Sequence, residues 1–181
     1  GMNTYGQLGH GDINNRDTLT KIEYFKDIEI VSASGGQFHS LCLDSTGTML
    51  YGFGRSCSGQ IGHTSTVPKV GSFESTPVPV FLKDDQTSNP IISKVSSGGM
   101  HSFALTSDGD IYSWGYAFTG SLGLGKTEDE DCQPCPLKVN VTLGVNRLKK
   151  KDGKKSVKCT SVKTVVGGGQ HSILVAHLQE K

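Results

Sequence analysis

Three histidines are the residues of this chain with the plainest capacity for chemistry. His39, His101 and His171 each stand in a Gly-x-x-His-Ser sequence, spaced 62 and then 70 residues apart. Histidine is the usual general base because its pKa lies near neutral pH. Identical placement in three copies favours instead one structural task repeated three times, with each ring tying a strand end to neighbouring backbone. The remaining histidines, His10, His63 and His177, stand in no nucleophile or metal pattern. We therefore expect no catalytic residue.

The cysteines raise a second chemical hypothesis. Cys132 and Cys135 form a Cys-x-x-Cys pair, which is compatible with zinc or redox chemistry. A structural zinc site usually needs four ligands, and Cys159 does not supply a second pair. The chain has five cysteines, and an odd number does not make a disulfide framework. A phosphate-binding Gly-x-x-x-x-Gly-Lys loop is also absent. We expect reduced thiols, no metal and no cofactor.

A basic insertion at residues 144–159 is the candidate for partner binding. Its cations are Arg147, Lys149, Lys150, Lys151, Lys154 and Lys155. They surround Asp152-Gly153, a turn dipeptide that suggests an exposed two-stranded hairpin. One interpretation is a solvated surface hairpin, to which the acidic segment Glu128–Asp131 could pair. The other is a contact for an acidic partner surface or phosphate. The net charge of +1 provides no general attraction to nucleic acid, so nucleic acid is expected only through this hairpin.

The elements that position these residues are short strands. Ser102–Thr106 and Ile111–Trp114 are compact apolar and aromatic runs bounded by glycine, which is typical of strands. Asp108-Gly109 lies between them, a dipeptide that tolerates the positive φ angles of a type I′ turn. We predict a β-hairpin.

A second motif alternates with the first and reveals an internal repeat. Gly-Gln/Ser-Leu/Ile-Gly occurs at Gly6–Gly9, Gly59–Gly62 and Gly120–Gly123. Repeats of this length, with four short strands in each, indicate a β-propeller. We place the outer strands at Lys21–Phe25, Val78–Leu82 and Pro136–Val141. The fold class is therefore expected to be all-β.

These motifs resemble the regulator of chromosome condensation repeat family. Gly98–Gly123 follows the family pattern nearly throughout, with Ser121 in place of glutamine, and Gly36–Gly62 has Phe53 in place of tryptophan. The resemblance implies a propeller whose seven blades close a ring. It also implies that the repeated glycines and histidines and the tryptophan have structural roles. These residues are Gly36, His39, Gly98, His101, Gly168, His171 and Trp114. For Trp114 we expect packing between blades, with stacking on a ligand as the alternative.

The repeat boundaries predict a single propeller segment of about three four-stranded blades, two complete and one split between the termini. The pieces are the end of a repeat at 1–32, repeats at 33–92 and 93–161, and the start of a repeat at 162–181. The third piece carries the basic insertion. Open sheet edges invite pairing with another strand. We expect either a segment of a larger propeller or a chain that self-associates or binds a partner.

The family resemblance also implies a function, in two alternatives. Members include exchange factors for the small GTPase Ran, and interaction modules in ubiquitin ligases and kinases. We expect a non-catalytic protein-interaction module that acts as a scaffold or regulator. The alternative is a chromatin-associated guanine-nucleotide exchange factor, which needs no acid-base residues because it stabilises the nucleotide-free GTPase. The expected partner is a protein, such as a small GTPase or histones.

The sequence also bears on location. Its apolar runs fall well short of the roughly 20 residues that span a bilayer, and it has no charged-then-apolar leader. We therefore expect no membrane partner and an intracellular location, cytoplasmic or nuclear.

Overall fold

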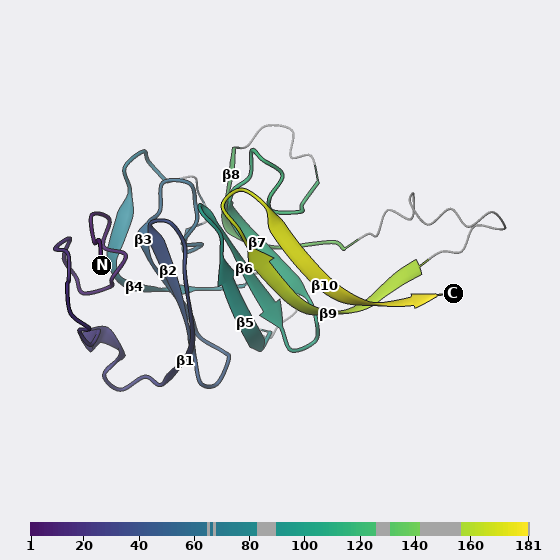
Figure 1. Ribbon diagram of the computed structural model, residues 1–181, viewed down its shortest axis with the longest axis horizontal. Coiled ribbons are helices and arrows are strands. Elements are labelled where there is room, and N and C mark those ends of the chain that lie inside the picture. The colour runs from purple at the N-terminus through teal and green to yellow at the C-terminus, as the bar shows by residue number, and fades with distance from the viewer. Residues whose placement is uncertain (65, 67, 83–89, 126–130, 142–156, 181) are drawn as a thin grey trace.

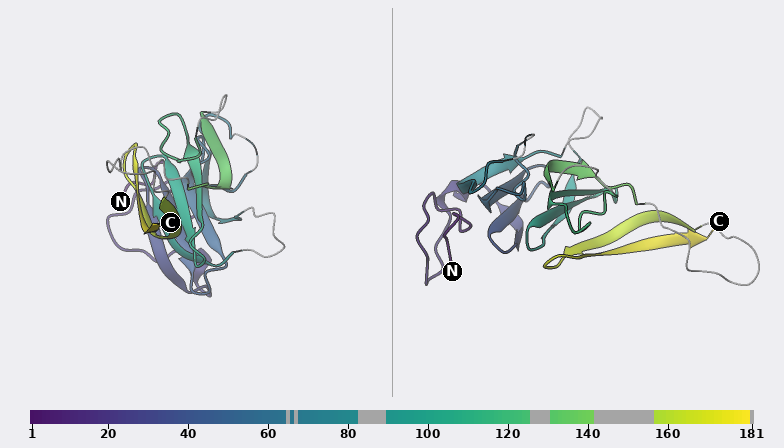
Figure 2. Two further views of the ribbon diagram at one scale, coloured as in Figure 1. Left: turned by 90° about the vertical axis from the view of Figure 1, so that its right-hand side faces the viewer. Right: turned by 90° about the horizontal axis from the view of Figure 1, so that it is seen from above.

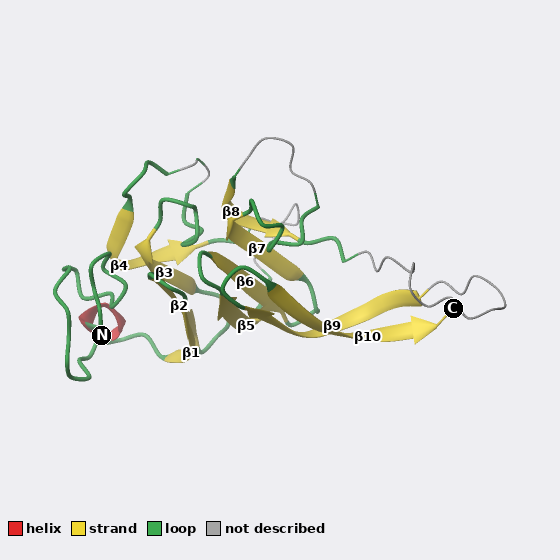
Figure 3. Ribbon diagram, turned by 45° about the horizontal axis from the view of Figure 1, so that its top comes forward, coloured by secondary structure: helices red, strands yellow, loops and turns green. Residues whose placement is uncertain are grey.

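The computed structural model describes residues 1–64, 66, 68–82, 90–125, 131–141 and 157–180. Their regular structure is almost entirely β-strand (Figure 3), which confirms the all-β prediction. Blade 1 consists of β1 (Ile30–Gly35), β2 (His39–Asp44), β3 (Leu50–Arg55) and β4 (Phe73–Val80). Blade 2 consists of β5 (Ile92–Ser97), β6 (His101–Thr106), β7 (Ile111–Tyr116) and β8 (Cys132–Lys138). A third sheet contains β9 (Val157–Gly167) and β10 (Ser172–Glu180).

Blades 1 and 2 have the same topology and the same register. Each is an antiparallel sheet whose strands are hydrogen-bonded in chain order. In blade 1, Ser40 pairs with Phe53, and in blade 2, Ser102 pairs with Trp114. The serine of the first motif therefore lies opposite the aromatic residue of the third strand in both copies.

The sheets follow one another along the long axis of the molecule, with the termini at opposite ends (Figure 1; Figure 2, right). Strand β5 packs against β1 and β2, and β9 packs against β5 and β6. The largest core cluster lies between blades 1 and 2 and includes Leu41, Ile61 and Trp114. A smaller cluster, with Phe103 and Val165, joins blade 2 to the third sheet. Apolar burial between successive sheets therefore holds the molecule together.

The turn after β6 differs in type from the prediction. Gly109 has a φ of +87°, but the described residues include no non-glycine residue with positive φ, so Asp108 does not adopt a type I′ conformation. The Gly109 amide donates to the Thr106 carbonyl at 3.1 Å, and the Asp110 amide donates to the Thr106 hydroxyl at 3.0 Å. The turn is one residue longer than a two-residue hairpin loop, and the threonine side chain satisfies the extra amide.

The predicted outer strand at Lys21–Phe25 is wrong. Glu23–Phe25 forms a single 3₁₀ turn. The rings of Tyr24 and Phe25 both contact Tyr51, with centroids 5.7 and 5.3 Å away. Successive side chains of a strand point to opposite faces, so a strand could not place both rings on one tyrosine. The turn instead covers the outer side of blade 1.

Candidate interaction surface

Each joint between blades contains a histidine and a serine. Nε2 of His39 lies 2.9 Å from Oγ of Ser102, and that hydroxyl donates to the carbonyl oxygen of Gln60 at 2.8 Å. Because the hydroxyl uses its only proton on the carbonyl, His39 must donate from Nε2. Nδ1 of His39 is buried and has no hydrogen-bond partner among the described residues. His39 is therefore the neutral Nε2–H tautomer.

The same arrangement recurs at the next joint. Nε2 of His101 lies 3.1 Å from Oγ of Ser172, which donates to the carbonyl oxygen of Ser121 at 2.8 Å. Earlier in the chain, Oγ of Ser40 donates to the carbonyl oxygen of Gln7 at 2.8 Å. The second residue of each Gly-Gln/Ser-Leu/Ile-Gly motif thus accepts a hydrogen bond from the serine of the next Gly-x-x-His-Ser motif. The third histidine, His171, is exposed.

Burial keeps the joint histidines neutral. Loss of solvation, with a smaller contribution from the nearby His101, lowers the pKa of His39 to about 3. Burial also lowers the pKa of His101, with a smaller contribution from His171. His39 is only 1% exposed, so a substrate cannot reach its ring. The geometry therefore suits a fixed hydrogen bond between blades better than proton transfer.

The glycines that begin these motifs make room for the histidine rings. A Cβ atom on Gly36, Gly98 or Gly168 would overlap the imidazole three residues later. The Gly36 amide also donates to the His39 carbonyl at 2.8 Å. The other two glycines make the equivalent bond to their own histidines. Only glycine allows the turn and the ring to lie this close.

Trp114 fills the space between blades 1 and 2. Its side chain is fully buried, and Nε1 donates to the Gln60 carbonyl oxygen at 3.0 Å. The ring lies so close to Gly62 that a Cβ there would come within 2.5 Å of Nε1. Phe53 takes the same position against Gly9. With no face exposed, the Trp114 ring is not available for stacking on a ligand.

The remaining candidates from the sequence are the basic insertion and the Cys-x-x-Cys pair. The basic residues Arg147, Lys149, Lys150, Lys151, Lys154 and Lys155 lie outside the described residues. Cys132 and Cys135 both lie on β8, three positions apart, so their side chains point to opposite faces of the sheet. Within the described part of the chain, no group of three or more His, Cys, Asp or Glu residues could hold a metal ion.

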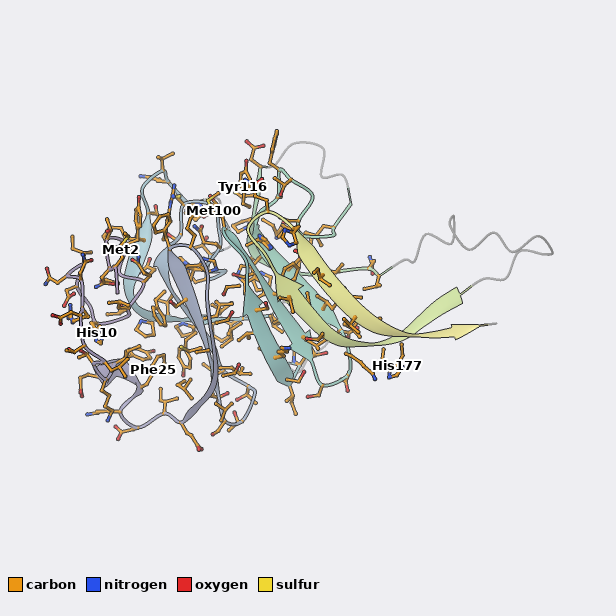
Figure 4. All side chains as sticks on the ribbon, in the orientation of Figure 1. Met2, His10, Phe25, Met100, Tyr116 and His177 are labelled. Carbon is orange, nitrogen blue, oxygen red and sulfur yellow. The ribbon has the colours of Figure 1, made fainter. Side chains whose placement is uncertain are left out.

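A hollow of about 520 Å³ lies where the three Gly-x-x-His turns converge. Its lining includes the glycines of these turns together with Gln37, Met100, Tyr116 and Gln170. The Tyr116 amide donates to the Met100 carbonyl at 2.9 Å, and Figure 4 places these two side chains together at one end of the blade. The hollow therefore has mixed glycine, amide and apolar walls and contains no buried charge among its described residues.

An aromatic cluster occupies the corresponding place on blade 1. The rings of Tyr5 and Phe38 meet edge to face at 5.2 Å, and the Arg55 guanidinium lies 5.3 Å from the Tyr5 ring centroid. Nε of Arg55 also donates to Sγ of Cys57 at 2.9 Å. All of these side chains are only partly buried. The guanidinium thus lies over the Tyr5 ring, with surface still open to solvent.

Repeat equivalence places the cluster and the hollow on one face. Phe38 and Met100 each precede the motif histidine, while Arg55 and Tyr116 each follow the glycine that ends the aromatic strand motif. We call Tyr5, Phe38, Arg55, Met100 and Tyr116 the aromatic face. Sequence reasoning missed these residues because it rested on positions that repeat. The sequence signal that could have found them is the opposite one, namely positions next to the repeated motifs at which the residue type differs between repeats.

In the described part of the chain, no helix has the length and apolar character needed to cross a membrane.

Comparison with known proteins identifies the repeat. The family profile described as the regulator of chromosome condensation (RCC1) repeat matches residues 1–43, 49–105 and 108–175. The ultraviolet-B receptor UVR8 of Arabidopsis thaliana is 29% identical over 170 residues, which cover 94% of this chain and 32% of the receptor. The mouse regulator of chromosome condensation is 28% identical over 177 residues, covering 97% of this chain and 36% of that protein. The chain thus spans about a third of the length of these relatives.

A solved structure supports the same fold. The crystal structure of Prp20p from Saccharomyces cerevisiae, a protein that binds Gsp1p and histones, superposes with a TM-score of 0.68 at 24% identity. The match covers 97% of this chain and 38% of Prp20p. At this identity the likeness concerns the fold alone, and it confirms the partial β-propeller. Together with the profile match along most of its length, it shows that this chain belongs to the regulator of chromosome condensation (RCC1) repeat family.

Proposed function

We propose that this chain is a non-catalytic propeller segment that binds a protein partner through the aromatic face. The supporting observation is the Arg55 guanidinium held against the rings of Tyr5 and Phe38. Aromatic residues, methionine and arginine are the side chains enriched at protein interfaces, and arginine is frequent among the residues that dominate binding energy. A guanidinium already held by aromatic contacts loses less conformational freedom when it binds a carboxylate or a carbonyl group.

The joints suit this proposal because they leave the aromatic face rigid. Arg55 and Tyr116 are the last residues of β3 and β7, whose other residues are buried. Their amides donate to the carbonyl groups of Phe38 and Met100, which precede the motif histidines of the same blades. Rigid presentation lowers the entropy cost of association. We also propose that the pieces 1–32, 33–92, 93–161 and 162–181 act as one segment.

The proposed partner is a Ran-like small GTPase or histones. The support is the fold shared with Prp20p, since Gsp1p and histones are binding partners of that protein. The basic residues of 144–159 would add charge complementarity to an acidic partner, which would make binding weaken as salt increases. Guanine-nucleotide exchange on the GTPase is the second candidate function, favoured by the likeness to the mouse regulator of chromosome condensation.

The Arg55→Glu variant is the test of the binding proposal. Isothermal titration with a Ran-like GTPase and with core histones is expected to give a specific complex with one of them. Arg55→Glu should weaken it at least tenfold, since interface arginines commonly contribute more than about 1.4 kcal/mol. Leu19→Glu is the control, because Leu19 is fully exposed and outside the aromatic face. Equal loss in both variants, or no effect of Arg55→Glu, would reject the aromatic face.

A separate assay distinguishes binding from exchange. The release of a fluorescent guanine nucleotide from the GTPase is measured with substoichiometric amounts of this chain. The binding proposal predicts a complex without faster release. Accelerated release that Arg55→Glu abolishes would instead establish exchange by the same face.

A further inference from the structure

A row of three side chains crosses one end of blade 1. The Arg55 amide donates to the Phe38 carbonyl at 2.8 Å, and Arg55 is paired with Phe73 in the ladder between β3 and β4. Residues directly opposite each other in an antiparallel ladder place their side chains on the same face of the sheet. The guanidinium also lies 6.0 Å from the Phe38 ring centroid. Arg55 is therefore flanked by an aromatic residue on either side, and we call Phe38, Arg55 and Phe73 the Arg55 row.

The outer end of the row is apolar and exposed to solvent. The side chain of Phe73 is 42% exposed. It follows a tight turn in which the Ser72 amide donates to the Lys69 carbonyl at 3.1 Å, and Val70 in this turn is fully exposed. The Ser56 amide donates to the Ser72 carbonyl at 2.8 Å, which ties the turn to the end of β3. An aromatic and an aliphatic side chain are thus held in solvent on a fixed part of the backbone.

The cations at the row have no carboxylate to neutralise them. Among the described residues, Arg55 and Lys69 form no ion pair. The nearest carboxylate along β4 is that of Glu74, which pairs with Gly54 in the ladder and so points to the other face of the sheet. Its carboxylate lies 3.4 Å from Nε2 of His63. The surface complementary to this end of blade 1 is therefore acidic as well as apolar.

We infer that the Arg55 row binds an extended acidic segment of the partner protein, in which an aspartate or glutamate has an apolar residue two positions away on each side. The inference rests on the proposed function, because Phe38 and Arg55 belong to the aromatic face, and it names the chemistry of the partner. Neighbouring strands lie about 4.8 Å apart, so the row spans about 10 Å. Alternate side chains of an extended segment share one face at intervals of about 6.7 Å. The carboxylate therefore meets Arg55 while the two apolar side chains contact Phe38 and Phe73.

The free donors of Arg55 fit a carboxylate. Its Nε donates to Sγ of Cys57, which leaves the two terminal nitrogens of the guanidinium for the partner. Two parallel hydrogen bonds from a guanidinium to a carboxylate are a strong and directional arrangement. The contacts with aromatic rings hold the guanidinium in place before the partner binds.

A peptide fits this row better than single-stranded nucleic acid does. Nucleic-acid bases bind proteins by stacking on free aromatic faces. The Arg55 guanidinium already lies over the Tyr5 ring, 5.3 Å from its centroid, and the Phe38 ring meets Tyr5 edge to face. The rings next to the cation are therefore engaged with each other and with the guanidinium.

Fluorescence anisotropy with a labelled peptide tests the inference. The probe is the designed peptide Gly-Ser-Leu-Ser-Glu-Ser-Leu-Ser-Gly, with the full chain as receptor. We expect saturable binding that is at least about fivefold weaker when the glutamate is replaced by glutamine, because the charge-assisted hydrogen bonds to Arg55 are weakened. Replacing both leucines by serine should weaken binding to a similar extent. A labelled single-stranded oligouridine should bind more weakly than the probe.

Receptor variants locate the site. Arg55→Glu should abolish binding of the probe, and a peptide with lysine in place of the glutamate should restore it, which only a direct contact explains. Phe73→Ser should weaken binding, whereas Phe81→Ser, the matched control, should not, because Phe81 is 56% exposed and follows the opposite end of β4. Lys69→Glu should also weaken binding, and Lys21→Glu, at an exposed residue of the N-terminal segment, should leave it unchanged.

Several results would overturn the inference. These are no binding of the probe, equal binding of the glutamine peptide, or equal effects of Phe73→Ser and Phe81→Ser. Stronger binding of the oligouridine would assign the row to nucleic acid instead. If Arg55→Glu weakens the complex with the GTPase or histones but the probe does not bind, the aromatic face stands and the acidic segment is rejected. If the probe binds as expected but Arg55→Glu leaves that complex unchanged, the proposed function is rejected and the inference about the row stands.

Discussion

Truncation of Trp114 to alanine is expected to lower the free energy of unfolding by about 3–5 kcal/mol, the usual cost of removing a large buried aromatic side chain. Trp114 is fully buried within the cluster that joins blades 1 and 2. The change also removes the donor to the Gln60 carbonyl oxygen. Denaturant unfolding followed by far-ultraviolet circular dichroism measures the loss.

Trp114→Phe gives a smaller loss of side-chain volume at the same buried position. Phe53 already fills the equivalent position of blade 1, so a phenylalanine should pack there and leave a smaller cavity. We expect a loss clearly below that of the alanine variant. Phe118→Ala is the surface control, because Phe118 is 73% exposed and its truncation should cost less than about 0.5 kcal/mol. Equal stability of Trp114→Ala and Phe118→Ala would contradict the conclusion that Trp114 holds blades 1 and 2 together.

Gly115→Ala is expected to destabilise the chain by at least about 2–3 kcal/mol through backbone strain and overlap. Gly115 has a φ of +105°. Its new Cβ would lie 2.6 Å from the Met100 carbonyl oxygen and 2.7 Å from the Cα of His101. Neither contact can relax without moving the turn that positions His101. Thermal unfolding should therefore shift downward by several degrees.

Gly120→Ala separates strain from overlap. Gly120 also has a positive φ, +69°, but nothing lies within 4 Å of the position its Cβ would take. Its substitution should cost only about 1–2 kcal/mol, the usual penalty for a non-glycine residue in the left-handed region. If Gly120→Ala lowers stability as much as Gly115→Ala does, the close approach of strands β6 and β7 at His101 is unimportant for stability.

The sheets were predictable because local patterns determine them. The serine–aromatic pairing in blades 1 and 2 follows from the same order of motifs along the chain. The N-terminal segment was not predictable in this way, because the conformation of Tyr24 and Phe25 depends on a distant ring, Tyr51. A pattern of neighbouring residues carries no record of such a partner.

The candidate site was predictable only in part. Repetition of His39 and His101 indicated a common role, but not that each ring reaches a serine of the following blade. The aromatic face has no motif of its own. Arg55 and Tyr5 come together because the first Gly-Gln-Leu-Gly loop lies beside the end of β3, where Gln7 approaches Gly54, a long-range contact.

The joint histidines also determine how stability depends on pH. An unfolded histidine takes up a proton near pH 6.5, whereas folded His39 remains neutral until about pH 3. The unfolded state therefore binds more protons between these values. Stability is full above pH 6.5 and falls as the pH drops toward 3, by up to about 1.4 kcal/mol per pH unit for this group.

Nitrogen-15 NMR of the imidazole rings tests the central claim. The claim is that neutral histidines join successive sheets, each by a hydrogen bond from its Nε2 to a serine hydroxyl of the following sheet. We predict that His39 carries its proton on Nε2 and keeps the chemical shift of a bare Nδ1 from pH 8 down to about pH 4, as long as the chain is folded. A His39 ring that titrates near pH 6.5, or that carries its proton on Nδ1, would contradict the claim.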